Sequence, residues 1–249
     1  MRVITKWQPD NFKLEKTTLW SFPQHGDWAT HNSKWRGNWS PYIPRNIILR
    51  YSQERDLILD QFVGGGTTLV EAKLLNRDIN GVDCNENAIN CCKEKIAFDY
   101  SPAQGRVYLQ QGDARDLWFQ NNSSIDLICT HPPYSNIIRY SEGIPEDLSL
   151  MKVNDFLDAM KSVAIESYRV LKKGKYCAVL IGDIRQKGDM IPLSFDVMRI
   201  FQEIGFVLKE LIIKEQHNCK ATSFWMNKSE RLNFLLIEHE HLFVFKKIH

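Results

Sequence analysis

The pattern of apolar and polar positions becomes regular near residue 45. From there on, short apolar, often β-branched runs alternate with longer amphipathic segments, which predicts alternating strands and helices. Helices between strands act as crossover connections, so the pattern predicts an α/β fold with a mostly parallel, doubly wound sheet. We expect strands near 57–60, 79–83, 107–110, 125–129 and 176–181, and helices near 67–76, 87–98, 153–171 and 195–204.

The last two expected strands, 206–214 and 231–245, depart from this alternation. Only a polar stretch, 215–228, lies between them. Two strands joined without a crossover helix run antiparallel to each other. We therefore expect one of them to oppose the other strands, in a hairpin at the edge of the sheet.

The first 40 residues have a different character. They contain five of the seven tryptophans and show neither helical nor strand periodicity. We interpret residues 1–40 as an aromatic-rich N-terminal arm, most of whose tryptophans form a small satellite core. Residues 41–249 are then the main domain, carrying small loop inserts, and a chain of 249 residues fits this organisation.

Charge and composition exclude several classes of protein. The formal net charge is only +2, with 32 basic and 30 acidic residues, which excludes a basic polyelectrolyte or an acidic disordered tail. No apolar run approaches the roughly 18 residues of a membrane span, and the N-terminus lacks the apolar core of a signal peptide. We expect a soluble, cytoplasmic protein.

The cysteines and histidines do not predict a metal centre. The six cysteines form no CxxC pair, which is typical of reduced intracellular thiols. The closest candidate ligand groups are His217 with Cys219 and His239 with His241. Neither has partners at zinc-finger spacing, so we expect no metal.

A glycine turn follows the first regular strand. Residues 57–60 are apolar up to Asp60, Gly64 to Gly66 follow, and a predicted helix begins near Thr67. Asp83 ends the next strand 23 residues after Asp60, close to the spacing of about 20 typical of a ribose-binding acid. Asp113 closes the third strand. The carboxyl ends of parallel strands meet at one edge, so these three acids should converge there.

Three carboxylates suit S-adenosylmethionine better than NAD or ATP. Asp83 can accept from both ribose hydroxyls, Asp113 from the adenine amine, and Asp60 can face a positively charged amino-acid end. A carboxylate beside the turn disfavours a pyrophosphate, and no Walker lysine follows the glycines. A role as helix caps remains the alternative for these acids.

A second motif, Thr130-His131-Pro132-Pro133-Tyr134, ends the fourth strand. Two successive prolines fix the backbone and remove two amide donors, which leaves rigid carbonyl acceptors suited to an NH₂ group. Tyr134 adds an aromatic ring on which a planar base can stack.

Together these motifs resemble the amino-methyltransferases of DNA, the cytosine-N4 and adenine-N6 family, with its DPFxGxGTT and (D/N/S)PP(Y/F/W) signatures. The resemblance covers residues 31 to 245, and includes His31 and the run 37–44. Gln61 replaces the usual proline, Gly65 the common serine, and a histidine occupies the Asp, Asn or Ser position. The matching residues are Asp60, Phe62, Gly64, Gly66, Thr67, Thr68 and Asp83 for the cofactor, and His131, Pro132, Pro133 and Tyr134 for the target amine.

The resemblance implies methyl transfer from S-adenosylmethionine to a base amine of double-stranded DNA, after the base leaves the stack. A histidine can accept the amine's hydrogen bond only while neutral, so turnover should fall below about pH 6.5. We favour cytosine N4 over adenine N6, because Thr130 is followed by a non-acidic residue. Alternatives are an RNA or protein-amide methyltransferase, and a catalytically silent cofactor-binding subunit.

The expected partners follow from the same resemblance. They are double-stranded DNA and, for a restriction-modification enzyme rather than an orphan methylase, a cognate restriction endonuclease, with the chain a monomer or homodimer. Because the net charge is low, DNA contacts require a local basic patch. Candidates are Lys34, Arg36 and Arg45 near the N-terminus, Arg139 after the Pro-Pro-Tyr turn, and Arg185 in the loop after the fifth strand.

Overall fold

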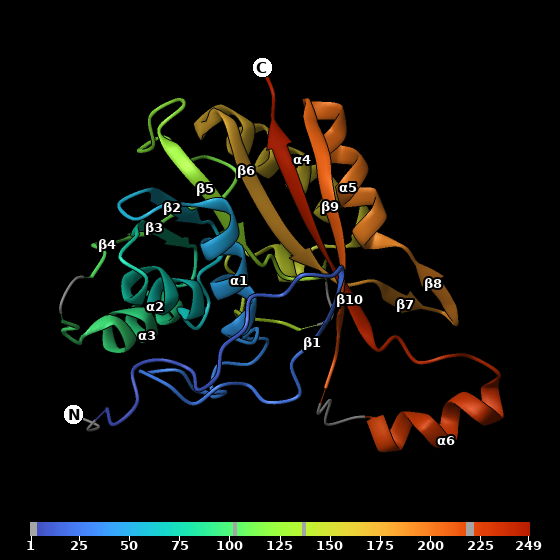
Figure 1. The fold of residues 1–249 in the computed structure, drawn as a ribbon. Coiled ribbons are helices and arrows are strands. Elements are labelled where there is room, and N and C mark those ends of the chain that lie inside the picture. The colour runs from blue at the N-terminus through green and yellow to red at the C-terminus, as the bar shows by residue number, and fades with distance from the viewer. Residues whose placement is uncertain (1–3, 102–103, 136–137, 218–221) are drawn as a thin grey trace.

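A computed structural model describes residues 4–101, 104–135, 138–217 and 222–249. Its centre is an eight-stranded sheet with the strand order β1-β9-β10-β6-β5-β2-β3-β4, and a β7–β8 hairpin projects beside it (Figure 1). The sheet strands are β1 (Leu19–Ser21), β2 (Leu57–Asp60), β3 (Asp78–Asp83), β4 (Val107–Gln111), β5 (Ile125–Thr130), β6 (Leu171–Ile181), β9 (Phe206–Glu215) and β10 (His239–Lys247). The hairpin strands are β7 (Ile184–Gln186) and β8 (Asp189–Ile191).

Helices cover both faces of the sheet. They are α1 (Tyr42–Tyr51), α2 (Thr67–Leu74), α3 (Glu86–Ile96), the short 3₁₀ turn η2 (Leu148–Leu150), α4 (Val153–Val170), α5 (Leu193–Ile204) and α6 (Thr222–Leu232). Helices α4 and α5 bury one face around Phe156 and Phe201, and α1 to α3 bury the other around Ile43, Leu69 and Cys92. Each buried phenylalanine, isoleucine or leucine among these contributes about 1.5–3 kcal/mol by leaving water. The predicted α/β, doubly wound fold is confirmed.

The C-terminal region differs in detail from the expectation. Strand β10 is antiparallel to both β6 and β9, as expected for one of the last two strands. It lies between them, however, so the antiparallel strand is not at the edge of the sheet. The last strand is present, but its predicted start at residue 231 is wrong, because α6 continues to Leu232 and β10 begins only at His239.

The first 40 residues pack closely against the rest of the chain. Strand β1 extends the sheet by pairing in parallel with β9. Trp28 is fully buried beside α2, and its Nε1 donates to Glu71 at 2.7 Å. Glu71 also bonds His31 at 2.7 Å and Arg45 at 2.9 Å. This buried carboxylate therefore joins the N-terminal segment and α1 to α2.

The topology brings several loops to one edge of the sheet. Strands β2, β3, β4, β5 and β6 are parallel, so their carboxyl ends lie together. The antiparallel β10 begins at this same edge, since His241 pairs with Ile181 at the end of β6. None of the helices within the described ranges is long and apolar enough to cross a membrane.

Candidate active site

The glycine turn joins β2 to α2 at the carboxyl edge. Gly64 and Gly66 have φ angles of 45° and 77°, in the left-handed region that favours glycine. The Gly64 amide donates to Asp83 Oδ2 at 2.9 Å. The turn after β2 and the acid that ends β3 are therefore held together as one unit.

Position 65 has no room for a side chain, because the N-terminal segment packs directly against it. A Cβ at this position would lie 2.6 Å from Asn38 Oδ1 and 2.7 Å from Trp35 Cβ. The segment containing Trp35 and Asn38 thus lies directly on the glycine turn. This explains why glycine stands where the family commonly has serine, and it makes this segment a wall of the site.

Asp60 and Gln61 connect the glycine turn to the second motif. Asp60 is buried, and its Oδ1 accepts from the Phe62 amide at 3.1 Å and from Thr130 Oγ1 at 2.9 Å. The Gln61 amide donates to Thr130 Oγ1 at 3.2 Å, a bond that proline cannot make, and Gln61 Oε1 accepts from Ser167 of α4 at 3.0 Å. Burial raises the pKa of Asp60 to about 6.

Asp83 is a partly buried acid whose two carboxylate oxygens both accept hydrogen bonds from backbone amides. Its Oδ1 accepts from the Asn85 amide at 3.0 Å, and burial, its main perturbation, raises its pKa to about 6. Asn85 caps α3, and its side-chain amide donates to the Tyr140 carbonyl at 2.9 Å. The loop containing Tyr140 therefore borders the acid expected to bind ribose.

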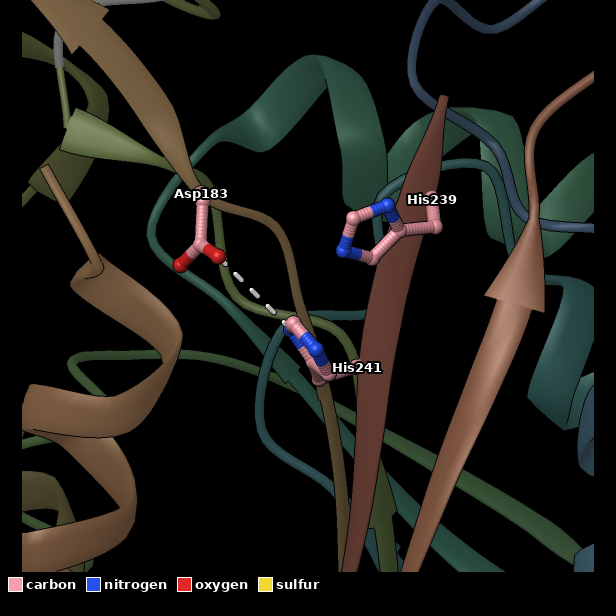
Figure 2. A group of neighbouring side chains, drawn as sticks. All are labelled: Asp183, His239 and His241. Carbon is pink, nitrogen blue, oxygen red and sulfur yellow. Dashed lines mark ion pairs between the residues drawn. The ribbon is translucent and has the colours of Figure 1, made fainter. Parts of the chain in front are cut away.

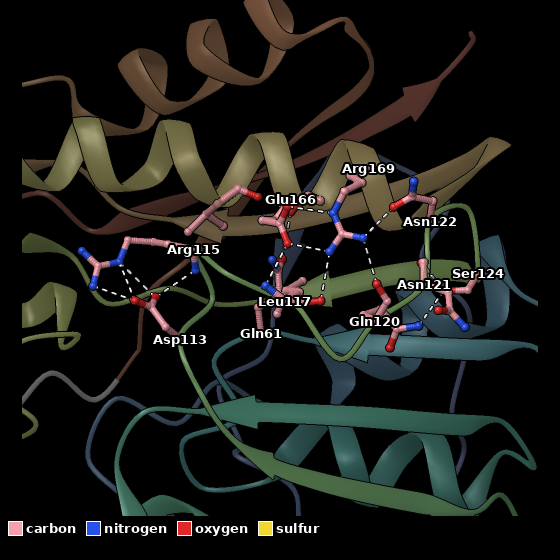
Figure 3. A network of polar contacts seen from close by, with 12 residues as sticks. Gln61, Asp113, Arg115, Leu117, Gln120, Asn121, Asn122, Ser124, Glu166 and Arg169 are labelled. Carbon is pink, nitrogen blue, oxygen red and sulfur yellow. Dashed lines mark hydrogen bonds and ion pairs between the residues drawn. The ribbon is translucent and has the colours of Figure 1, made fainter.

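Asp113 lies two residues beyond β4 and is less available. It forms an ion pair with Arg115 at 2.7 Å. Figure 3 shows how α4 anchors the following segment: Glu166 accepts from the Leu117 amide at 2.8 Å, and Arg169 donates to the Leu117 carbonyl at 2.9 Å. The loop is thus fixed, but Asp113 already has a cationic partner.

The His-Pro-Pro-Tyr turn is built into a bonded network that the sequence did not reveal. Nε2 of His131 is 2.7 Å from the Tyr134 hydroxyl, which donates to Glu240 Oε1 at 2.6 Å. Lys214 donates to Glu240 Oε2 at 2.8 Å, and Trp39 stacks on His131 with ring centroids 5.3 Å apart. Burial lowers the pKa of His131 to about 4. The sequence-based expectation of a fall in turnover below about pH 6.5 assumed an ordinary histidine pKa, and the pKa of the buried His131 ring lies lower.

A hollow of about 720 Å³ lies in the segment between β5 and α4. It is lined by Arg139, Tyr140, Ser141, Glu142, Gly143 and Leu150. The Tyr140 hydroxyl also lies close to Gly37, where a Cβ would overlap it. The hollow is thus bordered by the loop bonded to Asn85, and it has a size suited to a small-molecule ligand.

The candidate DNA-contact residues differ in availability. Lys34, Arg36 and Arg139 are exposed. Arg45 is buried in its ion pair with Glu71, so its expected DNA contact is wrong. Arg185 donates to the carbonyls of Gly188 and Leu235 at 2.7 and 3.0 Å, which joins the β7–β8 hairpin to the segment after α6.

Asp183 approaches the His239 and His241 pair at the start of β10 (Figure 2). One donor atom of each lies within 4.8 Å of the others, and His241 Nδ1 is 3.8 Å from Asp183 Oδ2. Tetrahedral zinc, with bonds of about 2.1 Å, holds its ligands about 3.4 Å apart. Ser194 Oγ instead joins Asp183 at 2.6 Å to His241 at 3.0 Å. We assign no metal to this group, and Cys219, the suggested partner of His217, lies outside the described residues.

The site fits the cofactor expected from the sequence. The structure brings together the glycine turn of Gly64 and Gly66, the acids Asp60 and Asp83, and the His131 to Tyr134 turn, with the Thr130–Asp60 bond joining the two motifs. The side-chain hydroxyl of Thr67 is buried without a hydrogen-bond partner among the described residues, whereas the Thr68 hydroxyl lies near the Asp60 carboxylate and favours its ionised form. A buried group without a partner at a glycine turn is consistent with a polar ligand.

Comparisons with known proteins place the chain in a class and a family. A structure of an S-adenosylmethionine-dependent methyltransferase from Methanosarcina mazei matches with a TM-score of 0.58 at 16% identity, covering 82% of this chain and 98% of the other. The fold is that of S-adenosylmethionine-dependent methyltransferases, and this is the cofactor that class and family imply. The DNA methylase family model matches residues 4–94 and 125–248, so the chain belongs to that family.

Curated relatives match over shorter stretches. The type II methyltransferase M2.LlaDCHI of Lactococcus lactis subsp. cremoris is 37% identical over 75 residues, 28% of each protein. The type II methyltransferase M.MjaVI of Methanocaldococcus jannaschii is 31% identical over 105 residues, 42% of this chain and 52% of that protein. The matched stretches thus span between about a quarter and a half of these relatives' own lengths.

Several residues of the site carried no recognisable sequence signal. Trp35 stands in an aperiodic segment, and Lys214 and Glu240 are single charges in the last two strands. Asn38 and Trp39 lie in the run 37–44 that is similar to the family, but this similarity assigned neither residue a contact. Only the alternation of β10 offered a hint, because Glu240 is a charged residue directly before an apolar run. Their roles depend on contacts between segments far apart in the chain.

Proposed function

We propose that the protein transfers a methyl group from S-adenosylmethionine to the exocyclic amine of a base in double-stranded DNA, with cytosine N4 favoured over adenine N6. The observation that carries this proposal is the direct Thr130–Asp60 hydrogen bond, which joins the glycine turn to the Pro-Pro-Tyr turn. A cofactor loop and an amine-binding loop fixed to each other favour group transfer between their two ligands.

The cofactor-binding residues follow from their chemistry. Asp83 would accept from the ribose hydroxyls, Asp60 would face the amino-acid end, and Asp113 would accept from the adenine amine. The backbone of Gly64 and Gly66 allows close approach, with Phe62, Thr67 and Thr68 flanking it. When bound, S-adenosylmethionine supplies a methyl group on a positively charged sulfur, which is electrophilic without further activation.

The second loop would hold the target amine. The Pro132 carbonyl and a neutral His131 each accept a hydrogen bond from it, which orients the nitrogen lone pair. Pro133 keeps this backbone rigid, and Tyr134 offers a ring against which an unstacked base can lie. The site acts through positioning and exclusion of water, and no strongly basic group is required.

The DNA substrate and the partners belong to the same proposal. Lys34, Arg36, Arg139 and Arg185 are the proposed contacts to the phosphate backbone. A cognate restriction endonuclease is the proposed functional partner, because the relatives described above are named type II methyltransferases. We further propose that the N-terminal 40 residues act with the main domain, since they cover the glycine turn.

The decisive experiment transfers labelled methyl groups to a mixed set of DNA duplexes, followed by nucleoside analysis. We expect N4-methylcytosine, and N6-methyladenine would correct the assigned base. RNA and protein substrates run in parallel, and methylation of these alone would contradict a DNA substrate. Cofactor binding without transfer to any substrate, unchanged in His131→Ser, would identify a catalytically silent subunit.

A further inference from the structure

Four side chains from three distant parts of the chain form one continuous line of hydrogen bonds. Lys214 of β9 bonds Glu240 of β10 at 2.8 Å, Glu240 bonds the Tyr134 hydroxyl at 2.6 Å, and this oxygen is 2.7 Å from His131 Nε2. Glu240 and Lys214 are both largely buried, with side chains 9% and 14% exposed. The methyl-transfer chemistry proposed above makes no use of either residue.

The proton positions along this line follow from counting donors. Burial opposes the charge on Glu240, but Lys214 and its other partners outweigh burial and lower its pKa, so it is a carboxylate that only accepts. The Tyr134 hydroxyl has one proton, which it gives to Glu240. The Tyr134 oxygen can then only accept from His131, so Nε2 of His131 carries the hydrogen.

A neutral imidazole carries one N–H, so Nδ1 of His131 keeps its lone pair. None of the described residues bonds this Nδ1 atom. Trp39 stacks on the His131 ring, and a Cβ at Gly182 would lie 2.9 Å from the Tyr134 ring, which shows how closely Tyr134 packs there. The ring atoms are therefore held while one acceptor stays available.

We propose that Glu240, oriented by Lys214, is a positioning residue that acts through Tyr134 to hold His131 in its Nε2–H form, so that Nδ1 accepts from the target amine. This inference rests on the proposed function for the identity of the amine, but not for the proton positions. It accounts for a histidine where the family has Asp, Asn or Ser, because histidine is a dependable acceptor only when its tautomer is fixed.

The opposite tautomer would be inactive for a physical reason. With the hydrogen on Nδ1, the ring would present a donor to an amine that is itself a donor. Glu240→Gln is expected to produce this state. Lys214 would take the amide oxygen, the amide NH₂ would donate to Tyr134, and Tyr134 would donate to Nε2, which reverses each bond in the line.

The first test reads the tautomer directly and needs no DNA. ¹⁵N-histidine-labelled protein is observed by two-bond ¹H–¹⁵N NMR at pH 7.5, with the His131 signals assigned by their loss in His131→Asn. We expect protonated Nε2 and unprotonated Nδ1. A protonated Nδ1 in the wild-type protein overturns the proposal, whether or not the protein methylates DNA.

The second test compares variants by tautomer and by kinetics. In Glu240→Gln we expect the hydrogen to move to Nδ1 and kcat to fall about 10²-fold, the size typical of losing one catalytic hydrogen-bond partner. The KM for S-adenosylmethionine should stay within about twofold. Lys214→Arg, which keeps the cation, should retain the tautomer and most of kcat. The matched control is Glu210→Gln, a partly exposed position nearer the other end of β9.

The outcomes separate this proposal from the proposed function. An unchanged tautomer with wild-type kcat in Glu240→Gln overturns the positioning role. The expected tautomer in a protein that methylates no DNA contradicts the proposed substrate and leaves the proton positions established. If Glu240→Gln does not fold, Tyr134→Phe retains the ring but breaks the line, and a mixture of His131 tautomers is expected. A single Nε2–H form in Tyr134→Phe would also overturn the proposal.

Discussion

At the scale of single residues, the proposed role of His131 as a hydrogen-bond acceptor determines how turnover should depend on acid. Burial lowers its pKa to about 4, so the acceptor form persists through mildly acidic pH. We predict a kcat that is flat between pH 5.5 and 8 at saturating cofactor and DNA, and that falls only at lower pH as the ring gains its proton. Stopped-time methylation assays across this range measure it. A midpoint near 6.5 would contradict the buried environment of the ring.

Asp83 should make cofactor binding sensitive to a different pH range. Burial raises its pKa to about 6, and ribose hydroxyls need the ionised carboxylate as acceptor. As pH falls below this value, a proton must leave before the cofactor binds. We predict that Kd rises by up to about tenfold per pH unit there, measured by calorimetry. Asp83→Asn should bind the cofactor weakly at every pH. Its Kd should depend less on pH, because only the titration of Asp60 remains. A wild-type Kd constant from pH 5 to 8 would refute this assignment.

At the scale of elements, the buried Glu71 of α2 holds the N-terminal segment in place. It accepts from Trp28, His31 and Arg45, and removal of one member of a buried ion pair typically costs about 3–5 kcal/mol. We predict a loss of this order in the free energy of unfolding for Glu71→Gln, measured by urea denaturation. Glu86→Gln, in the exposed first turn of α3, should change it by less than about 1 kcal/mol. Similar losses in both variants would show that the buried Glu71 contributes no more to the free energy of unfolding than an exposed glutamate.

The elements that sequence patterns predicted share one property: the apolar residues that define each element lie within that element. Strand β2 and helix α4 were placed within a residue or two because their own apolar positions define them. Helix α1 was missed, since Pro44 in its first turn obscures the spacing of Ile43, Ile47 and Ile48. Strand β1 has only three residues, and its pairing with distant β9 leaves no local pattern.

At the scale of the whole molecule, some residues of the candidate site could be predicted from the sequence and others could not. Asp60, Asp83 and the His131 to Tyr134 turn were predictable, because parallel strands bring their carboxyl ends to one edge. Glu240 lies 106 residues from Tyr134 and meets it only because β10 inserts between β6 and β9. No property of either residue's neighbours encodes that pairing.

Charge placement across the whole molecule yields the last prediction. Because the net charge is only +2, DNA affinity must depend on where the cations lie. Lys34 and Arg36 flank Trp35, whose side chain lies against the glycine turn. Each lost phosphate contact reduces the magnitude of the negative slope of log K against log salt by about 0.9. The double variant Lys34→Ala with Arg36→Ala should therefore reduce this magnitude by about 2.

The matched control removes two cations from the opposite edge of the sheet. Lys173 lies near the amino end of β6 and Lys209 near that of β9, and both are exposed. Either double variant lowers the net charge from +2 to 0, since 2 − 2 = 0. Fluorescence anisotropy with a labelled duplex at several salt concentrations compares the slopes. Equal changes in both variants would mean that total charge, rather than the basic residues beside the cofactor turn, governs DNA binding.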